Sequence, residues 1–97
     1  MKKLFLASAL AISAATAHAE PADISSLTCG ELATLDAETI AIVFFWIDGY
    51  VGGQAEDTSF DVERILANMD GSKAICDAEP GTTVMDAVIE AEATAAN

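Results

Sequence analysis

The chain has 97 residues, of which 16 are acidic, four are basic and one is histidine, so its formal charge is −12 at neutral pH. This excess of negative charge excludes nucleic acid as a partner and disfavours binding to anionic membrane surfaces. A chain of this length forms one domain, whose core supplies only a few kcal/mol unless a covalent link reinforces it.

Residues 1–19 have the pattern of a secretory signal peptide. Two lysines follow Met1, the apolar run after them is too short to span a bilayer, and Ala17-His18-Ala19 has the small-x-small form of a cleavage site. We therefore predict export and a mature helical domain over residues 20–97. Cleavage would remove the only histidine and two of the four basic residues, which leaves a formal charge of −14.

Two capping signals open the mature domain after a polar lead, 20–26, for which no regular structure is expected. Thr28-Cys29-Gly30-Glu31 fits the capping box, in which the Thr28 hydroxyl and the Glu31 carboxylate each accept from the other residue's backbone N–H. This pattern predicts a short helix from residue 29 to about residue 34. Asp36 then caps a second helix.

The segment 37–51 is the longest and most apolar helix candidate, and Gly52-Gly53 is expected to end it. One stripe at helical spacing contains Ile40, Val43, Phe44, Ile47 and Val51. Ile42, Phe45, Trp46 and Tyr50 lie outside that stripe, so the helix is apolar nearly all round. It is either buried on every side as a central helix or, because so small a domain has few residues to cover it, left with a surplus face for a dimer or a binding partner.

Three shorter helical segments follow. The first covers 61–69 and ends at Asp70-Gly71, the second runs from Ser72 to Cys76 before Pro80-Gly81, and the third is capped near Thr83. The last is expected to direct Val84, Val88 and Ile89 inward. The sequence thus predicts an all-α, single-domain bundle of four or five short helices around one apolar helix.

Cys29 and Cys76 are the only cysteines. In an oxidising, exported compartment two thiols form one disulfide, and closing a loop of about 48 residues stabilises the fold by roughly 4 kcal/mol. A redox or metal role would require a close pair of cysteines or histidine ligands. We therefore predict a structural bridge between the first helix and the segment that ends at Cys76.

The mature chain lacks the chemistry of common active sites. Without histidine, Ser-His and Cys-His nucleophile pairs are excluded, and a carboxylate pair would need a cleft that short helices do not provide. The acidic run from Asp57 to Glu63 invites comparison with a calcium loop, but Val62 replaces the turn glycine and Asn68 replaces the final glutamate. No catalytic residue, metal site or cofactor is predicted.

An ordered set of segments resembles the HdeA/HdeB family of periplasmic acid-stress chaperones. The set comprises Leu27-Thr28-Cys29-Gly30-Glu31-Leu32, Leu35-Asp36, Phe45-Trp46-Ile47-Asp48-Gly49-Tyr50-Val51 and Cys76, and the resemblance extends over residues 27–88. It implies a disulfide-linked helical protein that is a homodimer near neutral pH. In acid, such proteins loosen, expose apolar surface and hold unfolding periplasmic proteins without ATP.

The resemblance also implies where these roles lie in this chain. The surface for the dimer and for clients would comprise Ile40, Val43, Phe44, Phe45, Trp46, Ile47, Tyr50 and Val51. Glu31 and Asp61 match, by position, acids implicated in the pH response of the family, and Asp36 joins them as a charged helix cap. The rival interpretation is a constitutive interaction protein of the same fold, which binds one dedicated periplasmic partner at any pH.

One departure from the family concerns charge. Its best-known members carry many lysines toward the C-terminus, whereas residues 86–97 here contain no basic residue. Near pH 2 the mature chain would keep only Arg64, Lys73 and its terminal amine, a charge of roughly +3.

Overall fold

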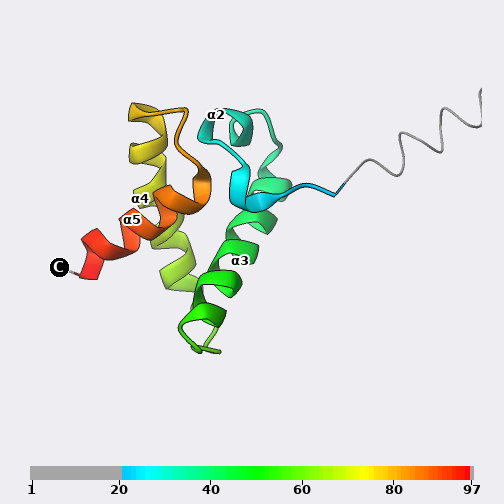
Figure 1. Cartoon of the computed structure of the whole chain (residues 1–97). Helices are drawn as coiled ribbons and strands as arrows, with labels where there is room; N and C mark the ends of the chain where they lie inside the picture. Colours follow the sequence, from blue (N-terminus) through cyan, green and yellow to red (C-terminus); the bar gives the residue numbers. More distant parts are fainter. Residues whose placement is uncertain (1–20, 97) are drawn as a thin grey trace, which may run out of the picture.

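The computed structural model describes residues 21–96, so the expected signal peptide lies outside the described residues. The described chain forms a 3₁₀ turn, η1 (Ile24–Ser26), and the helices α2 (Cys29–Leu32), α3 (Ala37–Gln54), α4 (Val62–Ala78) and α5 (Val84–Ala96). In Figure 1, α3 stands on one side, α4 and α5 cross on the other, and α2 lies over the end between them. The all-α prediction is confirmed, and no strand occurs within residues 21–96.

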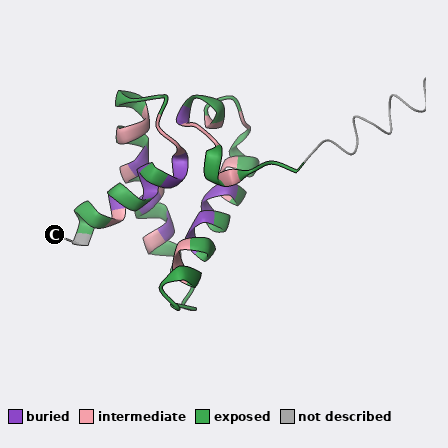
Figure 2. Cartoon of the chain, viewed as in Figure 1, coloured by how far each residue is buried: buried purple, intermediate pink, exposed green. Residues whose placement is uncertain are grey.

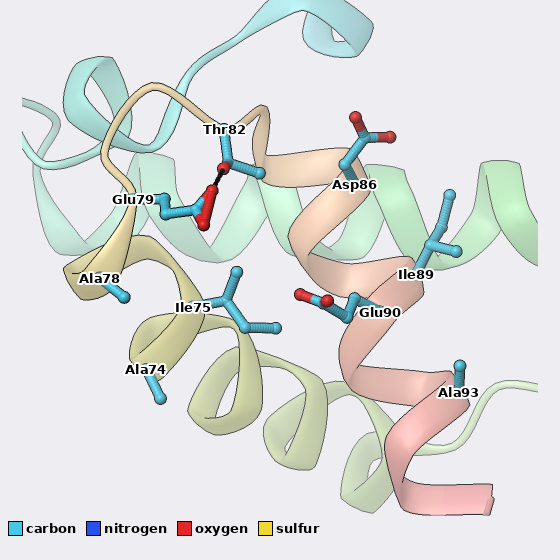
Figure 3. Close-up of a pocket in the computed structure, with 9 residues that line it drawn as sticks. All are labelled: Ala74, Ile75, Ala78, Glu79, Thr82, Asp86, Ile89, Glu90 and Ala93. Carbon is cyan, nitrogen blue, oxygen red and sulfur yellow. Dashed lines mark hydrogen bonds between the residues drawn. The ribbon is translucent and has the colours of Figure 1, made fainter.

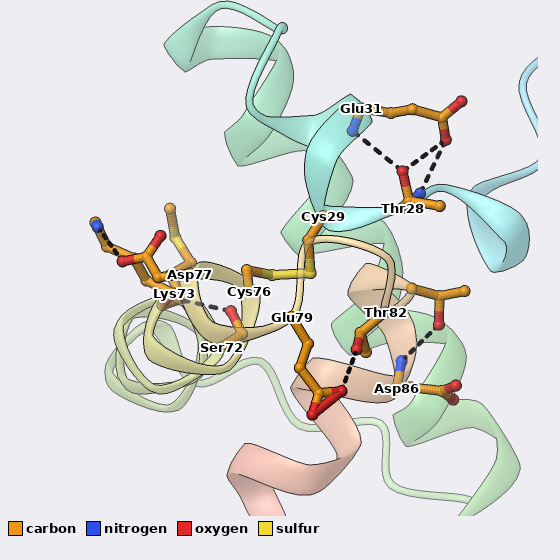
Figure 4. The surroundings of a disulfide bond; sticks show 12 residues. Thr28, Cys29, Glu31, Ser72, Lys73, Cys76, Asp77, Glu79, Thr82 and Asp86 are labelled. Atoms are coloured by element: carbon orange, nitrogen blue, oxygen red, sulfur yellow. Dashed lines mark hydrogen bonds and ion pairs between the residues drawn. A yellow bond between two sulfur atoms is a disulfide. The ribbon is translucent and has the colours of Figure 1, made fainter.

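Backbone hydrogen bonds fasten the segment before α2 to the turn before α5. The N–H of Cys29 donates to the carbonyl of Thr82 at 2.8 Å, and the N–H of Val84 donates to the carbonyl of Leu27 at 2.9 Å. Beside them, the predicted disulfide joins Cys29 to Cys76 with their Cα atoms 5.2 Å apart (Figure 4). This joint ties α2 to the end of α4 and the start of α5.

The local capping signals are confirmed. Glu31 N–H donates to the Thr28 hydroxyl at 3.1 Å and Thr28 N–H donates to the Glu31 carboxylate at 2.9 Å, which completes the capping box. Asp36 accepts from Thr39 N–H at 2.7 Å. The polar lead also contains structure that the sequence analysis did not anticipate, because the Asp23 side chain caps η1, and η1 contacts α5.

The inner stripe of α3 forms one wall of the core, as its spacing predicts. The buried core cluster consists of Val43, Phe44, Ile47, Ile65, Val84, Met85 and Val88. Ile40 and Val51 pack against its edges and are partly buried. Figure 2 shows the buried segments of α3 turned toward α4 and α5, with exposed segments on the opposite side.

The expected end of α3 at Gly52-Gly53 is wrong, because the helix continues to Gln54. No described glycine has a positive φ; Glu56, at 57°, adopts the left-handed conformation instead. Gly52 is needed for a close approach, since a Cβ there would lie 2.8 Å from the carbonyl oxygen of Asp57. The glycine therefore lets the following loop fold back against the helix and does not act as a stop.

The expected break at Asp70-Gly71 is also wrong, because α4 is one continuous helix where two were predicted. A Cβ on Gly71 would lie 3.0 Å from the Cβ of Ala91, so this glycine marks the closest crossing of α4 and α5. Ser72 is completely buried, and its hydroxyl donates to the Met69 carbonyl at 3.1 Å instead of capping a new helix. On α5, Val84 and Val88 face inward as expected, but Ile89 is 45% exposed.

Substitution of Gly71 and of Gly49, each inside a helix, should change the free energy of unfolding in opposite directions. Gly71→Val would force a side chain into the contact with Ala91 and should destabilise the fold by about 1 to 3 kcal/mol. Gly49→Ala places a methyl group where nothing lies within 4 Å and should stabilise α3 by about 0.5 to 1 kcal/mol. Urea unfolding of both variants measures the difference, and a neutral or stabilising Gly71→Val would contradict the close crossing.

Candidate functional site

The outer side of α3 carries large apolar side chains that the domain does not cover. Phe45, Trp46 and Tyr50 are each 44 to 48% exposed, and Ile42 beside them is 60% exposed. Phe60, from the loop between α3 and α4, is 69% exposed and packs edge-on against Phe45 at 6.0 Å between ring centroids. We refer to Phe45, Trp46, Tyr50 and Phe60 as the aromatic face.

The rings of the aromatic face hold one another in defined orientations. Trp46 and Tyr50 are one helical turn apart and stack with ring centroids 5.2 Å apart and planes only 7° from parallel. The Gln54 amide donates to the Tyr50 hydroxyl at 3.2 Å. Ordered, half-exposed rings of this kind present a large contact area at a low cost in conformational entropy.

A shallow cavity of about 280 Å³ separates α3 from the loop that follows it. Phe45 and Phe60 form its apolar walls, and Gly49 and Gly53 lie on its helical side. A Cβ on either glycine would meet nothing within 4 Å. Another helix could therefore approach the α3 backbone closely at this place.

An ion pair fastens the far end of α3 to α4, opposite the disulfide. The Arg64 guanidinium donates to both carboxylate oxygens of Asp48, from Nε and from Nη2, at 2.9 Å each. Asp48 is only 9% exposed, and the Arg64 side chain is 26% exposed. Bidentate pairing in so sheltered a place is the strong form of this interaction, and removing either partner leaves the other charge without compensation.

Further acidic groups surround Arg64. Its Nη1 lies 3.6 Å from a carboxylate oxygen of Asp57, and its Nη2 donates to the Ser59 carbonyl at 3.1 Å. The hydrogen bond to Asp48, then the charges of Asp48, Asp57 and Asp61, raise the pKa of Arg64 above its usual value. Arg64 is therefore cationic at every relevant pH, and any acid sensitivity of the cluster belongs to its carboxylates.

This ion pair was not predicted from the sequence, although two signals pointed to it. Asp48 is the only charged residue between Ile40 and Val51, and Arg64 is one of two basic residues after the expected cleavage site. A lone carboxylate on an apolar helix needs a partner, and few were available. Their separation of 16 positions in the sequence kept the pair out of reach of short-range patterns.

The structure does not bring the three pH-sensing candidates together. Each acts at a different helix N-terminus, Glu31 in the capping box of α2, Asp36 before α3 and Asp61 before α4, where its carboxylate accepts from Arg64 N–H at 3.2 Å. All three are exposed. They are separate local caps, so any joint effect would come from loosening several helix starts at once.

The eight residues expected to form the dimer and client surface are divided by the structure. Val43, Phe44 and Ile47 lie in the core, Ile40 and Val51 lie at its edge, and Phe45, Trp46 and Tyr50 lie on the aromatic face. Only the last three are exposed, and Ile40 and Val51 are partly buried.

Comparison with known proteins assigns the chain to a family. The model of the HdeA/HdeB family matches residues 2–86, which is most of the sequence. This chain belongs to the HdeA/HdeB family. Searches of curated proteins and of solved structures return no match.

For a member of the HdeA/HdeB family, two further observations bear on function. No helix within residues 21–96 combines the length and the hydrophobicity that a bilayer crossing requires. Among the same residues, no three acidic, histidine or cysteine side chains converge in a way that could hold a metal ion. In the acidic run examined as a calcium loop, Asp57 instead accepts from Ser59 N–H at 2.9 Å, and Asp61 caps α4.

Removing one partner of the ion pair should destabilise the fold more than removing both partners. Arg64→Met would leave the sheltered Asp48 carboxylate unpaired and should destabilise the fold by about 1 to 3 kcal/mol at pH 7. Adding Asp48→Leu should restore most of that loss, because replacing both partners by apolar groups is nearly neutral. Urea unfolding of Arg64→Met, of Asp48→Leu and of the double variant measures this coupling.

Lys73→Met is the matched control, because it removes the other basic residue of residues 21–96, whose pair with Asp77 is solvent-exposed on α4. Its effect should be slight. If Arg64→Met were as mild as Lys73→Met, the ion pair would not hold α3 to α4.

Two carboxylates, the Asp36 cap of α3 and Asp57 in the loop after it, should make the stability of the fold sensitive to acid. The hydrogen bonds from Thr39 lower the pKa of Asp36, and those from Ser59, with the charge of Arg64, lower the pKa of Asp57. A lowered folded-state pKa means that each group stabilises fully above the unfolded value of about 3.9 and loses this effect as pH falls through the folded value. Asp36→Asn keeps a good cap but does not titrate, so it should lose less stability than the wild type between pH 5 and pH 2.

Unfolding experiments at a series of pH values measure this difference. Glu38→Gln, in the same helical turn but without a capping bond, provides the control and should leave the acid dependence unchanged. An Asp36→Asn protein as acid-sensitive as the wild type would contradict a role for this cap.

Proposed function

We propose that this protein is a periplasmic, ATP-independent acid-stress chaperone, inactive as a homodimer near neutral pH and able to hold unfolding proteins in acid. The observation that carries the proposal is the aromatic face, where four large rings stay 44 to 69% exposed on one side of a very small domain. Contiguous exposed apolar surface of this kind is typical of sites for protein partners. Membership of a family of non-enzymatic chaperones supports binding as the function.

In the proposed neutral form, a second copy of the chain covers the aromatic face. Phe45, Trp46 and Tyr50 would lie at the centre of the interface, and the open surfaces of Gly49 and Gly53 would let the facing helix come close. Large aromatic residues are enriched at the centres of protein interfaces. Dissociation of the dimer would then uncover the same rings for unfolding clients.

Acid would act on the contacts that hold α3 in place. Protonation of Asp57 removes one of the charges that pair with Arg64 at the far end of α3, and protonation of Asp36 weakens the cap of α3. Loss of Glu31 and Asp61 as charged caps would loosen the starts of α2 and α4 in the same way. We expect the far end of α3 to move away from α4 and to expose the inner stripe, which adds Val43, Phe44 and Ile47 to the client surface.

The small number of basic residues shapes the proposed complexes. Near pH 2 the carboxylates are neutral, so Arg64, Lys73 and the terminal amine would supply a charge of only about +3. Charge on the chaperone would then contribute little to keeping complexes in solution, and the lysines and arginines of the bound client would have to do so.

The chaperone function is tested by following the aggregation of an acid-sensitive periplasmic protein from pH 7 to pH 2, with and without this protein. We expect suppression only in acid, and we expect Trp46→Ser with Tyr50→Ser to remove most of it. Ile89→Ser is the matched control, because Ile89 is 45% exposed but lies on α5, away from the aromatic face. Absence of suppression at every pH would refute the chaperone and favour the constitutive partner-binding protein.

The dimer has its own test in the emission of Trp46, the only tryptophan of the chain. At pH 7 the emission should shift to shorter wavelength as protein concentration rises, and sedimentation should show dimers over the same range. Both signals should disappear in acid. A monomer with unchanged emission up to high concentration at pH 7 would rule out the covered aromatic face.

A further inference from the structure

A second apolar surface, distinct from the aromatic face, lies between α4 and α5. It is a groove of about 650 Å³ on the part of the helix pair that lies between the Gly71–Ala91 crossing and the turn before α5. Its lining residues are Ala74, Ile75, Ala78, Glu79, Thr82, Asp86, Ile89, Glu90 and Ala93 (Figure 3). We refer to it as the α4–α5 groove.

The middle of the groove is aliphatic and shallow because its side chains are small. Alanines occupy positions one turn apart on α4, at 74 and 78, and Ala93 follows Ile89 by one turn on α5. Ile75 and Ile89 provide the larger apolar contacts, and Ile89 is nearly half-exposed. A surface of this shape suits a partner segment that offers a row of short aliphatic side chains.

The edge of the groove is acidic and has no basic counterpart. Glu79, Asp86 and Glu90 are its charged residues, and none of the lining residues is basic. In Figure 3 the Glu79 side chain bonds to Thr82, and Glu90 projects between the two helices. Three carboxylates on one groove attract a cationic partner, and their mutual repulsion is relieved when one binds.

The two basic residues of the described chain are engaged elsewhere. Arg64 pairs with Asp48 at the far end of α3, and Lys73 pairs with Asp77 at 2.9 Å on α4, outside the lining of the groove. A different cavity, of about 490 Å³ beside the disulfide, includes that Lys73–Asp77 pair and so lacks an excess of negative charge. The α4–α5 groove therefore combines apolar surface with uncompensated carboxylates.

We propose that the α4–α5 groove is a docking site for a basic amphipathic segment of a partner polypeptide, bound near neutral pH. Lysine or arginine side chains of the segment would pair with Glu79, Asp86 and Glu90, while alanine- or leucine-sized side chains would cover Ile75 and Ile89. This interaction is independent of the aromatic face and needs the folded form of the protein.

The test uses a labelled synthetic helix of alanine, leucine and lysine, with fluorescence anisotropy at pH 7 and an ionic strength of about 0.15 M, where the Debye length is about 8 Å. The triple variant Glu79→Gln, Asp86→Asn, Glu90→Gln should weaken binding by about tenfold, as expected for three partly exposed charge pairs. Ala93→Phe, at an exposed position, should block the groove and weaken binding without altering the fold measured by circular dichroism. A peptide with glutamine in place of lysine should bind poorly.

A matched triple variant separates the groove from the overall negative charge. Glu38→Gln, Glu63→Gln and Asp70→Asn remove three exposed carboxylates that do not line the groove and change the net charge equally. This control should leave the affinity within about twofold of the wild type, because surface charges beyond a Debye length are largely screened. Equal weakening by both triples, or unchanged binding by Ala93→Phe, would overturn the docking site and leave only general attraction of cations. Because the assay is done at pH 7 with Trp46 and Tyr50 intact, its failure would not affect the proposed chaperone function.

Discussion

The joint between the segment before α2 and the turn before α5 is the constraint on which the domain depends. Cys29 takes part in it twice, through its disulfide to Cys76 and through its N–H bond to Thr82. With α2 fixed in this way, the start of α5 places Val84 and Val88 where α3 can cover them. The joint thus compensates for a core that is too small to hold five elements together by apolar burial alone.

Helix α3 has one side in the core and one side that the domain leaves exposed. Its inner stripe closes the core, while its outer side leaves Trp46 and Tyr50 stacked in solvent. A larger domain would have covered both sides with further helices. In this chain the uncovered side is retained, and the sheltered pair of Asp48 and Arg64 fastens the helix where apolar contacts end.

Features that depend on residues close together in the sequence were predicted, whereas features that depend on tertiary contacts were mostly missed. The caps at Thr28 and Asp36 were predicted because a side chain and a backbone N–H three residues apart determine them. The breaks predicted at Gly52-Gly53 and Asp70-Gly71 were wrong because Gly52 and Gly71 serve close contacts, with the Asp57 carbonyl oxygen in the following loop and with Ala91 on α5, that helix-stop patterns do not reveal. The pairing of the cysteines was predictable only because the chain has no third one.

The candidate site shows the same division. Spacing alone separated the inner stripe from Phe45, Trp46 and Tyr50, but it could not show which side the domain would bury. The partnership of Asp48 with Arg64 depends on the return of the chain through the loop after α3, and the α4–α5 groove depends on the continuous course of α4. Both arise from tertiary packing, so they became visible only in the folded structure.

Under the proposed acid response, the position of the disulfide has a consequence for refolding on return to neutral pH. Cys29 and Cys76 enclose α3, the loop and most of α4 in one covalent ring, so an opened α3 stays tethered close to its place on α4. Tethering over such a length gives an effective concentration of roughly millimolar order, and reclosure is then a first-order process with the same half-time at any dilution. Reassociation of two copies is second-order and slows as the protein is diluted. On return to neutral pH the chain would regain its own fold first, and would do so even where it is too scarce to find its partner.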